Sequence, residues 1–192
     1  RVKLLQQMNS EVDPNHDAYI DGAKPGDFIN SVTNENYGTE LYVINVHFKE
    51  DFVLWRKRES GGGLIGTYTS QSAALDHLAK EGLKAEDHEI IQTQSHLLLR
   101  KDPETGELDK TPFLMDFASS KLRVSREWNT QIGQLGGDRF SALWKLSSLQ
   151  TQNRAAQKFY NLNAENQGWV TEEDYEYAKE VYTKLNLSPT DS

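Results

Sequence analysis

The stretch ELYVINVHFKEDFVLWRKRESGGGLIG, residues 40–66, decides the expected fold. In its first part, alternate residues would lie on the same face of an extended chain, and one face carries Tyr42, Ile44, Val46 and Phe48. Residues 49–51 supply a polar turn and FVLWRKR returns as a second strand, so the stretch predicts a β-hairpin. The glycines at 61–63 allow backbone angles that other residues avoid before LIGTYT resumes an extended form.

Similar patterns predict the rest of the secondary structure. Further strands are expected in HEIIQTQSHLLLR (88–100), TPFLMDFAS (111–119), RFSALWKLSSLQT (139–151) and AQKFYNLNAE (156–165). Helices are expected in SQSAALDHLAKEG (70–82), SSKLRVSREWNTQIGQLGG (119–137) and TEEDYEYAKEVYTKL (171–185). The expected N-caps are Ser70 or Ser72, Ser119 or Ser120, and Thr171.

This order of elements indicates an α+β fold. Short turns join most strands, and there is neither βαβ alternation nor a repeat of fixed period. We expect one antiparallel, β-rich domain over residues 1–192, either an OB-like barrel or a curved sheet, with about three helices. It would comprise an irregular lead-in (1–38), a β-rich core with inserted helices (39–163) and a C-terminal helix (171–186).

Composition excludes several classes of protein. The chain of 192 residues has no cysteine, which removes disulfide frameworks, thiolate zinc sites and cysteine nucleophiles. No stretch is apolar for long enough to span a membrane, so no membrane partner is expected. The net charge of −8 disfavours a polyanionic partner, but it is unevenly distributed. Between Lys121 and Lys158 seven Lys or Arg face two acids, and between Asn161 and Ser192 two lysines face seven acids.

The sequence contains no recognisable catalytic or metal-binding motif. The five histidines lack metal-ligand spacing and are expected on solvated or strand surfaces. Asp13, Asp17 and Asp21 lack the glycine and glutamate of a calcium loop, and the triple glycine lacks the lysine of a phosphate-binding loop. We therefore expect no enzyme, no cofactor and no metal.

Cations interleaved with aromatic residues are the remaining signal. Single-stranded nucleic acid is bound by cations that follow the phosphates and by rings that stack on bases. The candidate binding residues are Trp55, Arg56, Lys57, Arg58, Lys121, Arg123, Arg126 and Tyr160, with Tyr42 or Phe159 in reserve. For residues 56–58 two alternatives remain: a solvated hairpin end, or a phosphate contact with Arg56 and Arg58 on one strand face. Trp128 and Trp144 share apolar faces and are expected in the core.

Several motifs together resemble a family of bacteriophage proteins. KLLQ (3–6), GDFIN (26–30), FVLWRKRESGGGLIG (52–66), SSKLRVSREWNTQIG (119–133) and FYNLNAENQGWVTEEDYEYAKEVY (159–182) are similar to tailed-phage single-stranded-DNA-binding proteins of OB-like type. Proteins of that kind commonly end in a strongly acidic tail, whereas this chain ends in SPTDS after an acidic helix.

The resemblance implies a role in phage replication or recombination, in the cytoplasm of the infected host. Single-stranded DNA would be the partner, with replication or recombination proteins as further partners and a monomer or homodimer as the binding unit. The distant cations would meet in one trough, over which the glycine-hinged hairpin closes. The alternative is a phage structural or interaction protein that uses the acidic terminal helix as its contact surface.

Overall fold

The computed structural model describes residues 1–187; the tail SPTDS lies outside the described residues. Two antiparallel sheets and three α-helices make up the described chain. The small sheet holds β1 (Val2–Leu4), β2 (Phe28–Asn30) and β3 (Asn36–Gly38). The large sheet holds β4 (Glu40–Arg56), β5 (Leu64–Tyr68), β6 (His88–Arg100), β7 (Phe113–Ala118), β8 (Ala142–Gln152) and β9 (Lys158–Trp169). The helices are α1 (Gln71–Lys80), α2 (Leu122–Gln134) and α3 (Glu172–Leu187).

Strand β4 is the spine of the large sheet, and the hairpin turn predicted at residues 49–51 is wrong. The strand runs unbroken for 17 residues, with β6 along one edge and, along the other, β8 beside residues 40–44 and β5 beside residues 52–55. The polar residues at its centre are accommodated because they reach solvent and find partners. Glu50 accepts hydrogen bonds from Gln92 (2.8 Å) and Gln94 (2.7 Å), while Lys49 pairs with Asp51 at 3.0 Å.

A β-bulge at Val46 corrects the predicted alternation of β4. Asn45 lies opposite Leu98 and His47 opposite Leu97, so Val46 is an extra residue and the faces exchange beyond it. Phe48 therefore contacts His96 (ring centroids 5.2 Å apart) on the face that Asn45 shares. His47 lies instead near Tyr182 of α3, so it does not meet His96 across the sheet.

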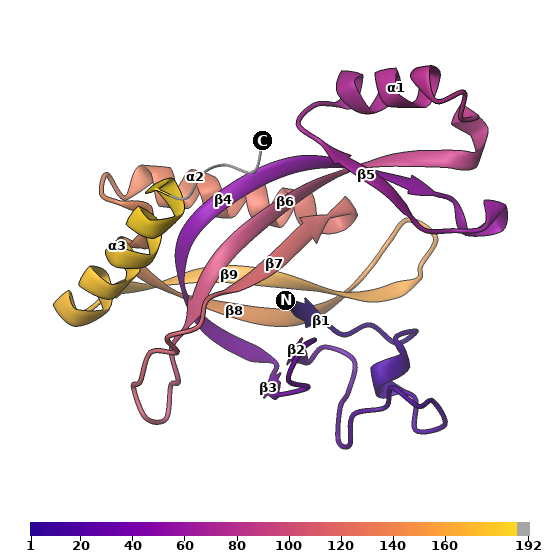
Figure 1. Cartoon of the computed structure of the whole chain (residues 1–192). Coiled ribbons are helices and arrows are strands. Elements are labelled where there is room, and N and C mark those ends of the chain that lie inside the picture. Colours follow the sequence, from indigo (N-terminus) through magenta and orange to yellow (C-terminus); the bar gives the residue numbers. More distant parts are fainter. Residues whose placement is uncertain (188–192) are drawn as a thin grey trace.

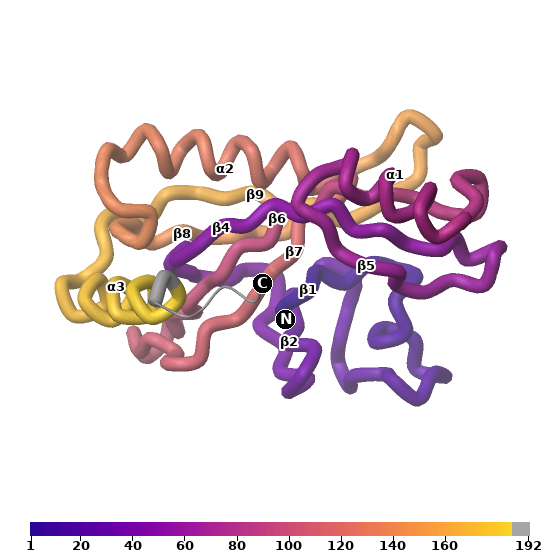
Figure 2. The backbone as a smooth tube through the Cα atoms, turned by 45° about the horizontal axis from the view of Figure 1, so that its top comes forward, coloured from indigo at the N-terminus to yellow at the C-terminus, as the bar shows by residue number. Residues whose placement is uncertain are grey.

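The two faces of the large sheet are covered by different helices. Helix α2 packs on one face, where Trp128 and Trp144 are fully buried with Phe117 and Leu98, as predicted for the two tryptophans. Helix α3 packs on the other face, where Ala178 meets Ile44 and Leu99. Figure 2 shows α1 and α2 above the strands, at opposite ends of the long β4–β6 pair.

The predicted α+β class, the antiparallel pairing and the three helices are confirmed. The sheet curves strongly but does not close into a barrel within residues 1–187 (Figure 1), so the curved sheet rather than the OB-like barrel is present. Ser70 caps α1 by accepting from the Ala73 N–H, and Thr171 accepts from the Asp174 N–H. Neither Ser119 nor Ser120 caps α2, because a 3₁₀ turn over Ser119–Lys121 precedes the helix and Lys121 occupies its N-cap position.

Candidate nucleic-acid interface

The basic residues 56–58 lie near the tip of a hairpin whose turn follows them, rather than at the end of the hairpin predicted around residues 49–51. Beyond Asp51 strand β4 pairs with β5, and we call residues 52–68 the arm (Figure 1). Strand β4 ends at Arg56, whose N–H donates to the Gly63 carbonyl at 2.9 Å, and Arg58 begins a 3₁₀ turn. The expectation that a strand carries Arg56 and Arg58 on one face is therefore wrong. Residues 61–63 have φ values of 112°, 70° and 107°, which glycine adopts without strain.

The arm exposes both kinds of side chain that bind single strands, namely cations and a flat ring. Trp55 is 37% exposed and lies opposite Leu64, which is 58% exposed. Arg56 and Arg58 are exposed and Lys57 is half-buried. Within residues 1–187 none of these three cations forms an ion pair, although the chain carries more acids than bases.

Arg126 approaches the arm from α2. Its guanidinium donates to Gln92 of β6 at 3.2 Å, and Arg56 lies opposite His88, four residues away on the same strand. At about 3.3 Å per residue the two positions on β6 are roughly 13 Å apart. Glu50 lies near the same place, and the hydrogen bonds from Gln94 and Gln92 lower its pKa. The structure thus places Arg56 and Arg126 beside the same strand, β6, with the carboxylate of Glu50 nearby.

The other two predicted cations near α2, Arg123 in the helix and Lys121 in the 3₁₀ turn before it, differ in environment. Arg123 is ion-paired with Glu127 at 2.8 Å, and both side chains are largely exposed. Lys121 is half-buried and makes no ion pair within the described chain, and burial lowers its pKa. It lines a hollow on the side of Phe159 rather than the arm.

Tyr160 is fixed by the N-terminal segment. The side-chain amide of Gln6 both donates to its carbonyl and accepts from its N–H, each at 2.8 Å. Its ring packs so closely on Gly26 that a Cβ there would lie 2.7 Å from it. Tyr42, the other tyrosine considered, is half-buried on β4. The sequence alone gives no sign of the contact with Gln6, since the two partners are 154 positions apart.

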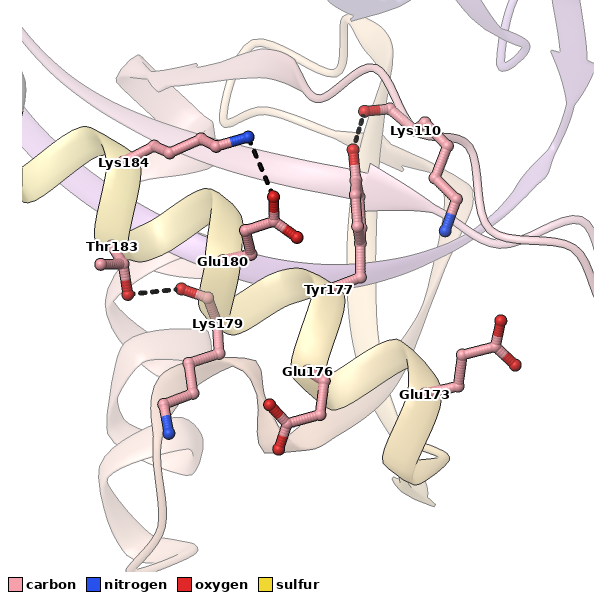
Figure 3. Close-up of a pocket in the computed structure, with 8 residues that line it drawn as sticks. All are labelled: Lys110, Glu173, Glu176, Tyr177, Lys179, Glu180, Thr183 and Lys184. Carbon is pink, nitrogen blue, oxygen red and sulfur yellow. Dashed lines mark hydrogen bonds and ion pairs between the residues drawn. The ribbon is translucent and has the colours of Figure 1, made fainter.

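The acidic surface of α3 carries mixed charge rather than acids alone. It borders a hollow of about 560 Å³ that includes the loop residue Lys110 (Figure 3). Tyr177 donates its hydroxyl proton to the Lys110 carbonyl, and the Lys110 ammonium lies 4.1 Å from the centre of the Tyr177 ring. Glu180 pairs with Lys184 at 3.0 Å, while Glu173 and Glu176 are exposed.

A buried polar network was missed by the sequence analysis. His96 is fully buried, contrary to the expected surface position, and stacks on Trp128 with ring centroids 4.9 Å apart. Its Nδ1 accepts from the Asn45 amide (2.8 Å), so its Nε2 carries the proton and donates to the Ser125 hydroxyl (2.7 Å). Burial, with a smaller effect of Arg139, lowers the pKa of His96 to about 3.

Two further features bear on the class of protein. Residues 1–187 contain no group of three His, Asp or Glu side chains placed to hold a metal ion. Over the same residues, none of the helices combines the length and apolar character needed to cross a membrane.

Comparison with known proteins identifies the family. The model of the Pam3 phage gp34-like protein family matches residues 1–188. The chain belongs to this family. This confirms a phage protein, the broader part of the resemblance found in the sequence. No curated protein and no solved structure matches the chain.

Proposed function

We propose that this Pam3 gp34-like protein binds single-stranded DNA without sequence preference and without catalysis, with the arm as its main contact. The observation that supports this most is the set of unpaired cations beside an exposed tryptophan. Arg56 and Arg58 lack ion pairs within residues 1–187, whereas Arg123 has one. A charged side chain with no internal partner is free to neutralise a phosphate.

The chemistry of the contact follows from the geometry of the arm. Phosphates would contact Arg56, Lys57 and Arg58 and release their condensed counterions. A base would stack on the exposed part of Trp55 at about 1–3 kcal/mol, which requires no particular base. The three glycines would let the tip adjust to the strand. The acidity of the remaining surface would repel the strand elsewhere and so direct it to the arm.

The contact would extend from the arm to α2. Arg126 donates to the neutral amide of Gln92, which shares a face of β6 with His88, the residue opposite Arg56, and Glu50 lies nearby. Arg123 is left out of the proposed contact because Glu127 already neutralises it. Such a protein would act in the cytoplasm of the infected cell during replication or recombination, where single strands are present.

A titration of fluorescein-labelled dT20 at salt concentrations between 50 and 300 mM tests the proposal. We expect binding to weaken linearly on a double-logarithmic plot, with a slope of about −0.7 for each phosphate neutralised. Unlabelled dC20 and dA20 should compete about equally with dT20. Absence of binding at 50 mM salt, or binding that ignores salt, would refute the proposal.

A structural or interaction role is the second candidate, and one observation favours it. Trp169, at the end of β9, is 68% exposed, and α3 with its surface of mixed charge follows directly. A large exposed ring next to charged residues is typical of a protein contact. Trp169→Ala should leave dT20 affinity unchanged if the arm binds the strand. In pull-downs from infected cells, loss of a phage partner in this variant, together with absent dT20 binding, would favour the structural role.

A further inference from the structure

We infer that a hollow beside Lys121 is a separate binding site for a nucleoside phosphate. The hollow measures about 750 Å³ and lies between the N-terminal segment, the start of α2 and the turn that joins β8 to β9. Cavities of roughly 300–1,000 Å³ are typical of small-molecule sites. Its lining includes Gln6, Ser120, Lys121, Gln157, Lys158 and Phe159.

The charge of the lining is the first reason. Among residues 1–187 no carboxylate lines the hollow, although the chain has 29 acids and 21 Lys or Arg. Three glutamates, by contrast, border the hollow along α3. Lys121 and Lys158 make no ion pair within residues 1–187. Lys121 is half-buried, so its positive charge is poorly solvated and a bound anion would stabilise it.

The remaining lining suits a nucleoside. Phe159 is half-buried and offers a ring on which a base can stack. Side-chain amides and a serine hydroxyl supply donors and acceptors for the polar edge of a base and for a sugar. Two lysines with a ring and amides are therefore the combination that a nucleoside phosphate needs.

The walls of the hollow are already held in place. Gln6 is fixed by two hydrogen bonds to the Tyr160 backbone, each of 2.8 Å, which tie the N-terminal segment to β9. Asn153 holds the β8–β9 turn by donating to Gln157 (2.9 Å) and accepting from its N–H (3.0 Å). Asn161 donates to the Ser120 carbonyl at 3.2 Å and ties the third wall to β9. A ligand would lose little free energy to ordering such a site.

One wall of the hollow, the β8–β9 turn, lies toward the same end of the molecule as the arm. The β8–β9 turn and the tip of the arm both extend toward the right in Figures 1 and 2. The phosphate could therefore belong to a free nucleotide or to the terminal nucleotide of a strand that continues toward the arm. Only the second source rests on the proposed function.

Calorimetry with dTMP and with thymidine tests the site itself. We expect dTMP to bind at least tenfold more tightly than thymidine, because two lysines contact the phosphate. Lys158→Gln and Lys121→Gln should each weaken dTMP binding at least fivefold. Lys179→Gln, which removes an exposed lysine of α3, is the matched control and should change nothing. Because Lys158 is exposed, its variant will fold even if the Lys121 variant does not.

Competition identifies the source of the phosphate. Displacement of dTMP by 5′-phosphorylated dT4 but not by 5′-hydroxyl dT4 would indicate a strand end, and displacement by neither would indicate a free nucleotide. Undetectable dTMP binding, or equal binding by wild type and Lys158→Gln, would overturn the inference. The same variants are titrated with dT20, so that failure of the hollow is distinguished from failure of the arm.

Discussion

The two halves of strand β4 lie in opposite environments. In the first half Leu41, Val43 and Ile44 are at most 1% exposed, because α2 covers one face of the sheet and α3 the other. In the second half the strand enters the arm, where Trp55 is 37% exposed and Arg56 makes no ion pair within the described chain. The difference separates stability from binding. Changes at the buried positions of the first half should alter folding, and changes at the exposed positions of the arm should alter affinity, whereas Leu54 of the arm is fully buried and belongs with the first group.

The largest expected effect contrasts two tryptophans. Trp128→Ala should lower the free energy of unfolding by about 3–5 kcal/mol, because it opens a cavity in the core beneath α2. Trp55→Ala should lower it by less than about 1 kcal/mol, as is usual for a surface position. Urea denaturation of both variants measures the contrast. Equal losses would show that the arm is part of the cooperative core.

The next effect is a dependence of stability on pH that originates in the first half. Folding keeps His96 neutral because its pKa falls from 6.5 to about 3, whereas the unfolded chain takes up a proton below pH 6.5. His96 therefore does not lower the free energy of unfolding above pH 6.5, and below that pH the free energy of unfolding falls as the unfolded chain takes up the proton. The decrease approaches about 1.4 kcal/mol per pH unit.

Urea denaturation at pH 7, 6 and 5 measures this slope. His96→Asn should flatten it, while His16→Gln, which changes an exposed histidine, should leave it intact. A slope that is unchanged in His96→Asn would assign the proton uptake to another group. The pH range stays above 5 so that carboxylates such as Glu50 contribute little.

The third effect concerns the cations of the arm. Arg56→Ala with Arg58→Ala should weaken dT20 binding on the order of 30-fold, since two charged contacts are lost. The salt slope should flatten by about 1.4, from the loss of two phosphate contacts. Arg123→Ala is the matched control, because Glu127 already neutralises that arginine, and should change affinity less than about twofold. If Arg123→Ala weakens binding and the double variant does not, the strand lies along α2 rather than the arm.

The smallest expected effect is the loss of stacking on the arm. Trp55→Ala should weaken dT20 binding about fivefold to tenfold, near the lower limit for base–ring stacking, because only part of the ring is exposed. Trp55→Phe should retain most of the affinity, since a flat ring remains. Fluorescence anisotropy at constant salt measures both. Equal affinity of the alanine and phenylalanine variants would show that the ring does not stack.

Local patterns predicted the parts of the fold that local physics controls. The apolar spacing of α2 placed Trp128 in the core, and Ser70 was one of the two caps expected for α1. Residues 49–51 resemble a turn in sequence. An exposed strand whose residues have partners on β6 can carry the same polar residues, and only the tertiary pairing distinguishes such a strand from a turn. The bulge at Val46 has no local signal, and it reverses the faces of every later residue of β4.

The candidate site was predictable in composition but not in arrangement. The sequence identified the arm's cations and Trp55, because a basic run beside glycines is visible without a fold. It could not show which cations are already neutralised, since this depends on where Glu127 and other acids lie. The hollow beside Lys121 was also hidden, because its walls come from three distant segments.

Hydrogen exchange measured by mass spectrometry, with and without saturating dT20, shows which backbone segments the bound strand protects. We predict slower exchange of backbone amides in residues 55–64 when the strand is bound, with exchange in α3 unchanged. Protection confined to α3, or binding of dT20 that leaves the arm's exchange unaltered, would contradict it.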